Sequence, residues 1–88
     1  MDARTIRQAI VDGLEAGAVV RIGRRDTRSS FLAGEIDIAF ADLEMDSLAR
    51  MELCIAIELG TGVSLAPEEL DRYTTLEALV RDVQERAR

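Results

Sequence analysis

The 88-residue chain contains no histidine, no tryptophan, one cysteine and one proline, and only 3% of its residues are aromatic. Without histidine it lacks the usual zinc ligands, imidazole acid–base chemistry and Ser-His-Asp triads. A single cysteine excludes an intramolecular disulfide and a Cys-x-x-Cys pair, so a reducing compartment is expected. The apolar runs are too short to cross a membrane, and the N-terminal sequence Met1-Asp2-Ala3-Arg4 lacks the hydrophobic stretch of a signal peptide. We therefore expect a cytoplasmic protein.

The residues that are present favour one small, acidic domain spanning 1–88. Hydrophobic residues make up 48%, which allows a modest core built from aliphatic side chains. Acidic residues number 17 and basic residues 11, all of them arginine, for a net charge of −6. The whole excess of negative charge lies in residues 41–88. Nucleic acid and anionic membranes require clustered positive charge, so we expect neither as a partner and favour proteins with basic surfaces.

Helical periodicity and end signals predict an all-α four-helix bundle with three longer helices and a short third one. Apolar residues at helical spacing predict the first helix over 2–16. The second helix is predicted from Asp46 to about Leu59, with Gly60 as the residue just after its end. Pro67, followed by two glutamates, predicts the short third helix.

The last helix is predicted from a capping box, Thr74-x-x-Glu77, followed by an apolar stripe. Residues 18–22 are short and apolar, and they fit either a last helical turn or an extended connection. Residues 23–45 open with turn-forming residues and show no apolar period, which predicts a long loop between helices one and two. Three arginines in it, Arg24, Arg25 and Arg28, fit a solvated loop better than a phosphate patch.

Asp46 and Ser47 mark the start of the second helix. Aspartate is a favoured N-cap, which places Ser47 at the first helical position, beside unpaired backbone N–H groups and the positive end of the helix dipole. A phosphate attached to that hydroxyl would be stabilised there. Asp46 is also suited to help bind the metal ion of a phosphate-transferring enzyme. Taken alone, the Asp-Ser pair is most simply a helix cap.

The surrounding sequence indicates more than a cap. Residues 40–48 read F-A-D-L-E-M-D-S-L, and this pattern strongly resembles the phosphopantetheine attachment site of acyl carrier proteins. Residues 51–58 resemble the second helix of that family, and 74–79 resemble the start of its fourth. The resemblance is close over residues 36–88, whereas residues 1–20 share only the general pattern of apolar residues at helical spacing.

The resemblance implies that Ser47 receives 4′-phosphopantetheine from coenzyme A through a separate, magnesium-dependent phosphopantetheinyl transferase. The thiol of this arm would carry an acyl group as a thioester. The chain itself would be a non-catalytic, monomeric carrier. Its other partners would be acyl- or aminoacyl-loading enzymes, acyltransferases or synthases with basic docking surfaces.

The chain departs from the family pattern at two places. Glu44 stands where the family has glycine, and a glutamate there is strained if the position requires a positive φ. Ala49 and Arg50 follow Leu48, where fatty-acid carriers often have an acid two residues after the serine. A polyketide or related natural-product pathway is therefore favoured over fatty-acid synthesis. The sequence Glu44-Met45-Asp46-Ser47 fits acyl carriers better than peptidyl carriers, but an aminoacyl cargo stays open.

The second helix has two apolar sides, separated by angle at about 100° per residue. One side holds Leu53, Cys54 and Ile57 and is predicted to face the core, with Cys54 as a small core residue. The other side is flanked by acids and predicts a partner surface, to which Glu44 adds charge; its members are Leu48, Met51, Glu52, Ile55 and Glu58. The alternative is a helix buried on most sides.

Two other function classes remain open from the sequence alone. A small helical interaction or regulatory domain would use Ser47 only as a cap. A small enzyme ranks last, because no histidine, paired-acid site or glycine-rich phosphate loop is evident.

Overall fold

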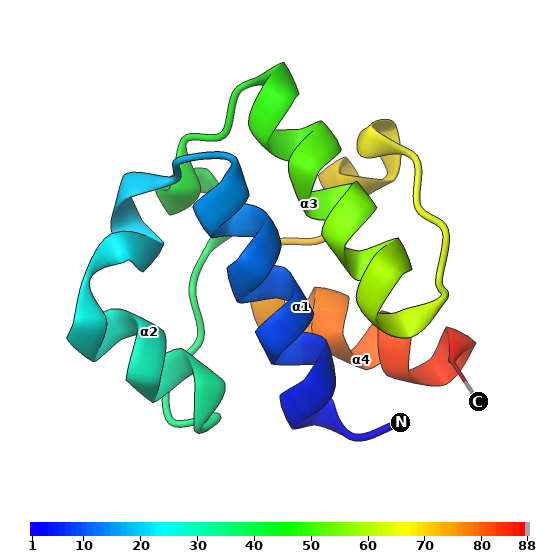
Figure 1. Ribbon diagram of the computed structural model, residues 1–88, viewed down its shortest axis with the longest axis horizontal. Helices are drawn as coiled ribbons and strands as arrows, with labels where there is room; N and C mark the ends of the chain where they lie inside the picture. Colours follow the sequence, from blue (N-terminus) through cyan, green and yellow to red (C-terminus); the bar gives the residue numbers. More distant parts are fainter. Residues whose placement is uncertain (88) are drawn as a thin grey trace.

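The computed structural model describes residues 1–87 and shows an all-helical protein (Figure 1). Its elements are α1 (Ala3–Ala16), η1 (Val20–Gly23), α2 (Arg25–Leu32), η2 (Phe40–Leu43), α3 (Ser47–Thr61), η3 (Pro67–Arg72) and α4 (Leu76–Arg86). No strand occurs within residues 1–87, although an isolated antiparallel bridge joins Ala39 to Thr75. The predicted all-α class is confirmed, with α1, α3 and α4 as the longer helices and η3 as the short one. No helix in this part of the chain combines the length and apolar character needed to cross a membrane.

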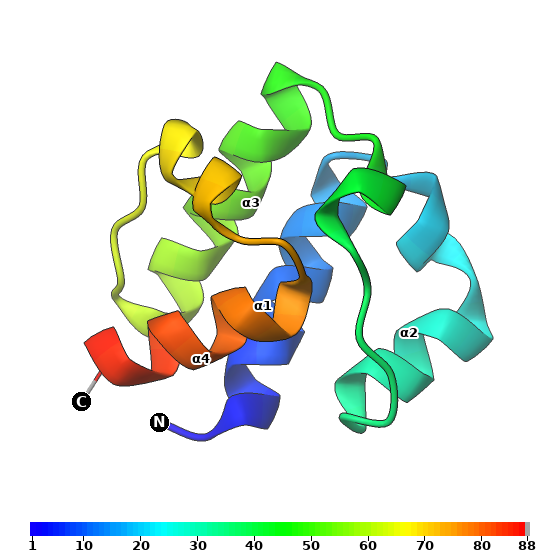
Figure 2. The ribbon, with the colours of Figure 1, turned by 180° about the vertical axis from the view of Figure 1, so that it is seen from behind.

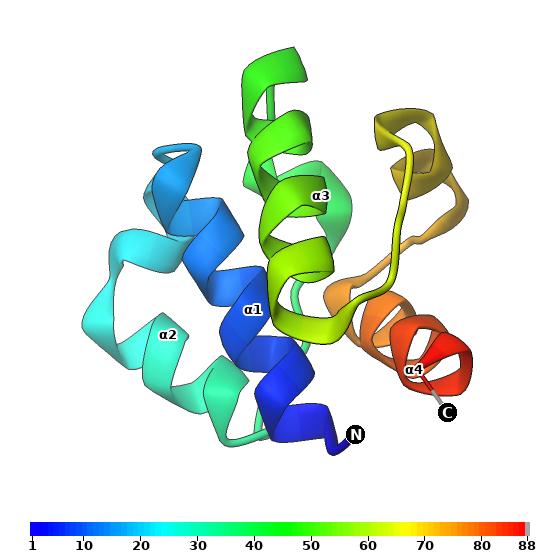
Figure 3. The same ribbon diagram turned by 45° about the vertical axis from the view of Figure 1, so that its right-hand side comes forward.

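Helices α1 and α3 form the centre of the molecule and lie side by side (Figures 1 and 3). Small residues let their backbones approach closely. A Cβ added at Gly13 would lie 2.8 Å from the Cα of Leu53, and one at Gly17 would lie 2.9 Å from the Cα of Ala49. The interface therefore requires glycine at both positions, since a larger residue would force the two helices apart.

The core lies between this pair and the helices around it. Its fully buried large side chains come from every helical segment except η2: Ile6, Ile10, Val11, Leu14, Ile22, Phe31, Leu53, Ile57, Leu70, Leu76 and Leu79, together with Ile38 of the connection. Only one of them, Phe31, is aromatic, as the composition predicts. Burying such side chains supplies most of the favourable free energy of folding for a domain of this size.

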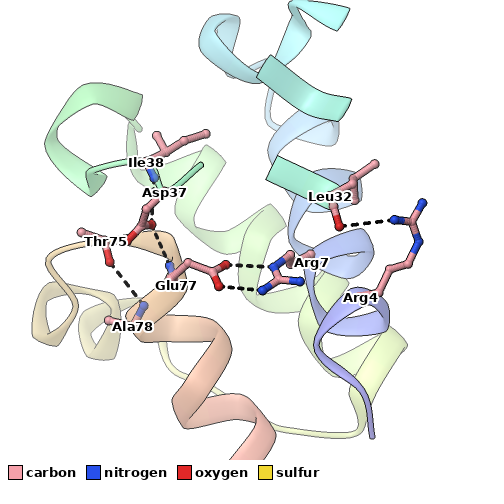
Figure 4. A network of polar contacts seen from close by, with 8 residues as sticks. All are labelled: Arg4, Arg7, Leu32, Asp37, Ile38, Thr75, Glu77 and Ala78. Atoms are coloured by element: carbon pink, nitrogen blue, oxygen red, sulfur yellow. Dashed lines mark hydrogen bonds and ion pairs between the residues drawn. The ribbon is translucent and has the colours of Figure 1, made fainter. Parts of the chain in front are cut away.

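Helix α4 packs across α1 on the face opposite α2 (Figure 2). Arg7 of α1 donates two hydrogen bonds to the carboxylate of Glu77 on α4, at 2.9 and 2.7 Å (Figure 4). The Glu77 carboxylate raises the pKa of Arg7. The backbone N–H of Glu77 also donates to Oδ1 of Asp37, at 3.0 Å. Glu77 thus connects α1, α4 and the segment that leads to η2.

The prediction of a long loop over 23–45 is wrong in part, because these residues contain α2 and η2. The eight-residue α2 has no side-chain N-cap, and it buries just one side chain, Phe31. A single buried residue creates no periodic pattern, so the sequence gives little sign of this helix.

The apolar stretch 18–22 is neither a last turn of α1 nor a strand. Ala18 has φ of 57°, which ends the helical path, and η1 follows.

Two predicted helix ends are displaced. Gly60 does not follow the second helix: α3 continues to Thr61, and Gly62 with φ of 78° caps it. Gly60 lies within the helix, where the lack of a Cβ allows close packing on α1, since a Cβ there would come within 2.9 Å of the Cβ of Ala9. The last helix is capped by Thr75 rather than Thr74, and the Thr75 hydroxyl accepts from the N–H of Ala78. The capping box is therefore wrong, and Glu77 binds Arg7 instead of the cap.

Candidate functional site

The start of α3 presents Ser47 to solvent. Asp46 is the N-cap, with extended backbone, and its Oδ1 accepts a hydrogen bond from the N–H of Ala49 at 2.8 Å. Ser47 is the first helical residue and is exposed. Its hydroxyl makes no hydrogen bond to residues 1–87, and neither does Oδ2 of Asp46. The predicted cap and position of Ser47 are confirmed, and the hydroxyl is accessible for reaction.

The segment before Ser47 is anchored to the start of α4. The N–H of Phe40 donates to the carbonyl of Thr74, and the N–H of Leu76 donates to the carbonyl of Ile38, both at 2.9 Å. The ring of Phe40 stacks on that of Tyr73 with centroids 6.4 Å apart. Leu43 at the end of η2 is buried. The apolar residues that precede Asp46 in the motif therefore fix the entry to α3.

Glu44 has a left-handed backbone, with φ of 50° and ψ of 44°. This confirms that the position requires the conformation that favours glycine. Its side chain is exposed, and Asp42, Glu44 and Asp46 place three carboxylates within five residues before Ser47. The chain therefore accepts a strained residue three positions before Ser47 and has a negative charge there.

Replacing Glu44 with glycine is expected to stabilise the fold by up to about 1 kcal/mol, because glycine adopts this backbone without the Cβ penalty. Urea unfolding of the unmodified protein measures the change. Glu44→Ala is the matched control, since it removes the charge and keeps the Cβ, and it should not gain stability. Equal stability of the glycine and alanine variants would contradict backbone strain at this position.

The two predicted sides of the second helix are confirmed by burial. Leu53 and Ile57 are completely buried, and Cys54 is also in the core. Met51 and Ile55 are 50% and 48% exposed on the other side. Burial raises the pKa of the Cys54 thiol, helped by the nearby charges of Glu69 and Glu68, so the thiol stays protonated.

The exposed apolar side chains form a stripe along the whole of α3, which we call the α3 stripe: Leu48, Met51, Ile55 and Leu59. Leu59 is the most exposed of the four, at 84%, and was not among the predicted partner residues. It lies eleven residues after Leu48, which is three helical turns, so the same angular argument could have included it. Glu58 is exposed beside the stripe, and Glu52 is half-buried.

Two of the hollows that border the start of α3 are relevant to the site. The first, of about 440 Å³, lies between α3 and the η1 region, and its lining includes Arg21, Arg24 and Asp46. The second, also about 440 Å³, lies between α3 and η3; we call it the η3 hollow, and it is lined by Ser47, Arg50, Met51, Pro67, Glu68 and Asp71. Ser47 lines only the second of these two.

The three arginines predicted to be solvated, Arg24, Arg25 and Arg28, are exposed. Arg28 pairs with Glu15 at 3.3 Å, and the side chains of the other two make no ion pair within residues 1–87. Their exposure agrees with the interpretation as solvated charges, although Arg25 and Arg28 lie on α2 and Arg24 joins η1 to α2.

An anchored segment delivers an exposed serine to the capped N-terminus of α3, a geometry that leaves the hydroxyl open to covalent attachment of a group. Residues 31–83 match the family described as the phosphopantetheine attachment site. The chain therefore belongs to this family and is an acyl carrier protein-type carrier that bears 4′-phosphopantetheine. No significant match is found among curated proteins or solved structures.

The residues at the start of α3 fit such a group. Attachment of a phosphate ester at Ser47 requires an accessible hydroxyl, and the charged phosphate must stay in contact with solvent. Ser47 meets both requirements because its side chain is exposed. The unpaired N–H groups of the first turn and the helix dipole favour the added negative charge. The carboxylate of Asp46 keeps the first turn formed while the serine side chain remains free.

Proposed function

We propose that residues 1–88 form one monomeric, non-catalytic acyl carrier domain with Ser47 as its attachment residue. The observation that carries the proposal is the exposed, unpartnered Ser47 hydroxyl at the first position of α3, inside the family match. The thiol of the attached arm holds an acyl group as a thioester. The chain's own part is to present that arm on a fixed helix end and to provide a surface that partner enzymes bind.

Asp46 is proposed to serve the attachment step as well as the helix. One carboxylate oxygen caps α3, and Oδ2 remains free beside the serine. A carboxylate oxygen in this position is suited to the magnesium ion of a phosphopantetheinyl transferase. Incubation with coenzyme A, magnesium and such a transferase should add the mass of one phosphopantetheine, located on the peptide that contains Ser47.

The cargo is proposed to be an acyl group of a polyketide or related natural-product pathway. The sequence Glu44-Met45-Asp46-Ser47 supports an acyl cargo over a peptidyl one, and Ala49 in place of an acid argues against ordinary fatty-acid synthesis. Aminoacyl and fatty-acyl cargo are the alternatives. Mass spectrometry of the thioester on protein isolated from its native host distinguishes the three.

The proposed partner surface is the α3 stripe with Glu44, Glu52 and Glu58. It combines apolar side chains that are exposed without a partner with carboxylates along their edges. Apolar contacts of this kind supply affinity, and the charges steer the approach of a basic partner. Phosphopantetheinyl transferases, loading enzymes, acyltransferases and synthases are the expected partners.

Charge reversal beside the stripe should slow transfer. Glu58→Lys and Glu52→Lys are expected to lower the rate of phosphopantetheine attachment several-fold at low salt, because steering by opposite charge is lost. Attachment rates over a salt series measure this effect, and the difference from the unsubstituted protein should shrink as salt increases. Glu35→Lys makes the same charge change at an exposed residue outside α3 and is the control. Equal slowing by all three would locate the effect in net charge instead of the surface.

A further inference from the structure

Arg50 lies three residues after Ser47 and shares the η3 hollow with it. Helical residues at this spacing are neighbours, with Cβ atoms about 5–6 Å apart. Helical side chains also lean toward the N-terminus of their helix. The guanidinium of Arg50 therefore extends back toward the level of Ser47, on the side of α3 that faces η3.

The present partners of Arg50 both belong to η3. Its Nη2 lies 2.8 Å from Oδ1 of Asp71, and its Nη1 donates a hydrogen bond to the carbonyl of Pro67 at 3.4 Å. The Arg50 side chain is 32% exposed and that of Asp71 is 70% exposed. Ion pairs so open to solvent are weak, so Asp71 is a partner that can be exchanged.

Arg50 is a basic residue in an acidic part of the surface around Ser47. The η3 hollow holds the carboxylates of Glu68 and Asp71, and Asp46 and Glu44 lie one and three residues before the serine. Arg50 is the one cation among the residues that line the hollow. A phosphodiester on Ser47 adds a further negative charge to this acidic region. The planar guanidinium, with its several N–H donors, matches phosphate oxygens well.

We propose that Arg50 binds the phosphate of the phosphopantetheine arm, and that attachment of the arm draws the guanidinium wholly or partly away from Asp71. This inference rests on the proposed attachment at Ser47 and adds a positioning residue to that site. Through Arg50 the base of the arm is held toward the η3 hollow, away from the hollow that Arg21 and Arg24 line.

The test compares apo and holo protein by NMR, with holo protein identified by its mass. The first measurement is the rate at which the guanidinium protons of Arg50 exchange with solvent. In apo Asp71→Asn the exchange should be about threefold faster than in apo protein of unchanged sequence, the size expected for loss of one exposed ion pair. In holo Asp71→Asn the exchange should slow again, because the phosphate takes the place of the carboxylate. Arg28, which pairs with Glu15 and does not line the η3 hollow, is the internal control and should not change on attachment.

The second measurement is the ³¹P resonance of the phosphodiester. Arg50→Gln should shift it, Arg50→Lys should shift it less, and Arg28→Gln should leave it unchanged. The inference would be overturned if, in protein of holo mass, the Arg50 exchange rate did not change on attachment and the ³¹P resonance did not change on substitution of Arg50. The proposed function would still stand in that case. A mass that does not increase would overturn both. If Asp71→Asn fails to fold, the ³¹P comparison alone decides.

Discussion

Replacing Ser47 with alanine is expected to abolish attachment of phosphopantetheine without disturbing the fold. The Ser47 side chain is exposed and makes no hydrogen bond to residues 1–87, while the cap of α3 is provided by Asp46. The free energy of unfolding should therefore change by no more than about 0.5 kcal/mol, as for other surface substitutions. Intact mass after incubation with coenzyme A, magnesium and a phosphopantetheinyl transferase measures attachment, and urea unfolding measures stability.

Ser64→Ala is the matched control, because it removes an exposed hydroxyl from the connection that follows α3. This variant should gain one phosphopantetheine like the unsubstituted protein. A Ser47→Ala protein that still gains the arm would show that another residue is the attachment site. Loss of attachment in both variants would indicate a general effect on recognition.

The largest effect on stability is expected where α3 contacts the core. Leu53→Ala and Ile57→Ala should each lower the free energy of unfolding by about 2–5 kcal/mol, because both side chains are completely buried and truncation leaves a cavity. Met51→Ala and Ile55→Ala remove half-exposed side chains from the same helix and should cost under about 1 kcal/mol. Thermal or urea unfolding of the four apo variants measures the difference.

The same four variants separate stability from partner binding. Met51→Ala and Ile55→Ala should slow phosphopantetheine attachment or acyl transfer, because they remove apolar area from the proposed partner surface. Leu53→Ala should transfer normally at temperatures where it remains folded. Normal transfer by both Met51→Ala and Ile55→Ala would refute the α3 stripe as the partner surface, even though their exposure is correct.

The sequence predicts the elements that combine a long apolar stripe with end signals. Helix α1 carries a side-chain cap at Asp2, and α3 carries one at Asp46; both starts were predicted correctly. The orientation of α3 followed from angle alone, since its buried and exposed apolar residues lie on opposite sides. The motif around Ser47 added the functional site, which no physical signal in Asp46-Ser47 alone could distinguish from a cap.

The failures come from contacts between segments far apart in the chain. Gly60 looks like a helix end, but it lies inside α3 and is small because Ala9 of α1 packs closely against it. Glu77 looks like part of a capping box with Thr74, but Arg7, seventy residues away in sequence, binds it instead. Helix α2 depends on the burial of Phe31 for much of its stability. None of these contacts is visible in local sequence.

The two sides of the Ser47 region are held by different kinds of bonds. On one side, backbone hydrogen bonds at Phe40 and Leu76 join the entry segment to the start of α4. On the other side, toward η3, the ion pair between Arg50 and Asp71 is open to solvent. Local opening of a native protein begins where few buried contacts and exposed bonds hold a segment. Amide hydrogen exchange should therefore be faster in η3 than at Phe40 and Leu76, whose N–H groups make the bonds on the first side. The site would then have one flank that keeps its structure and one flank that opens more readily when a partner enzyme binds.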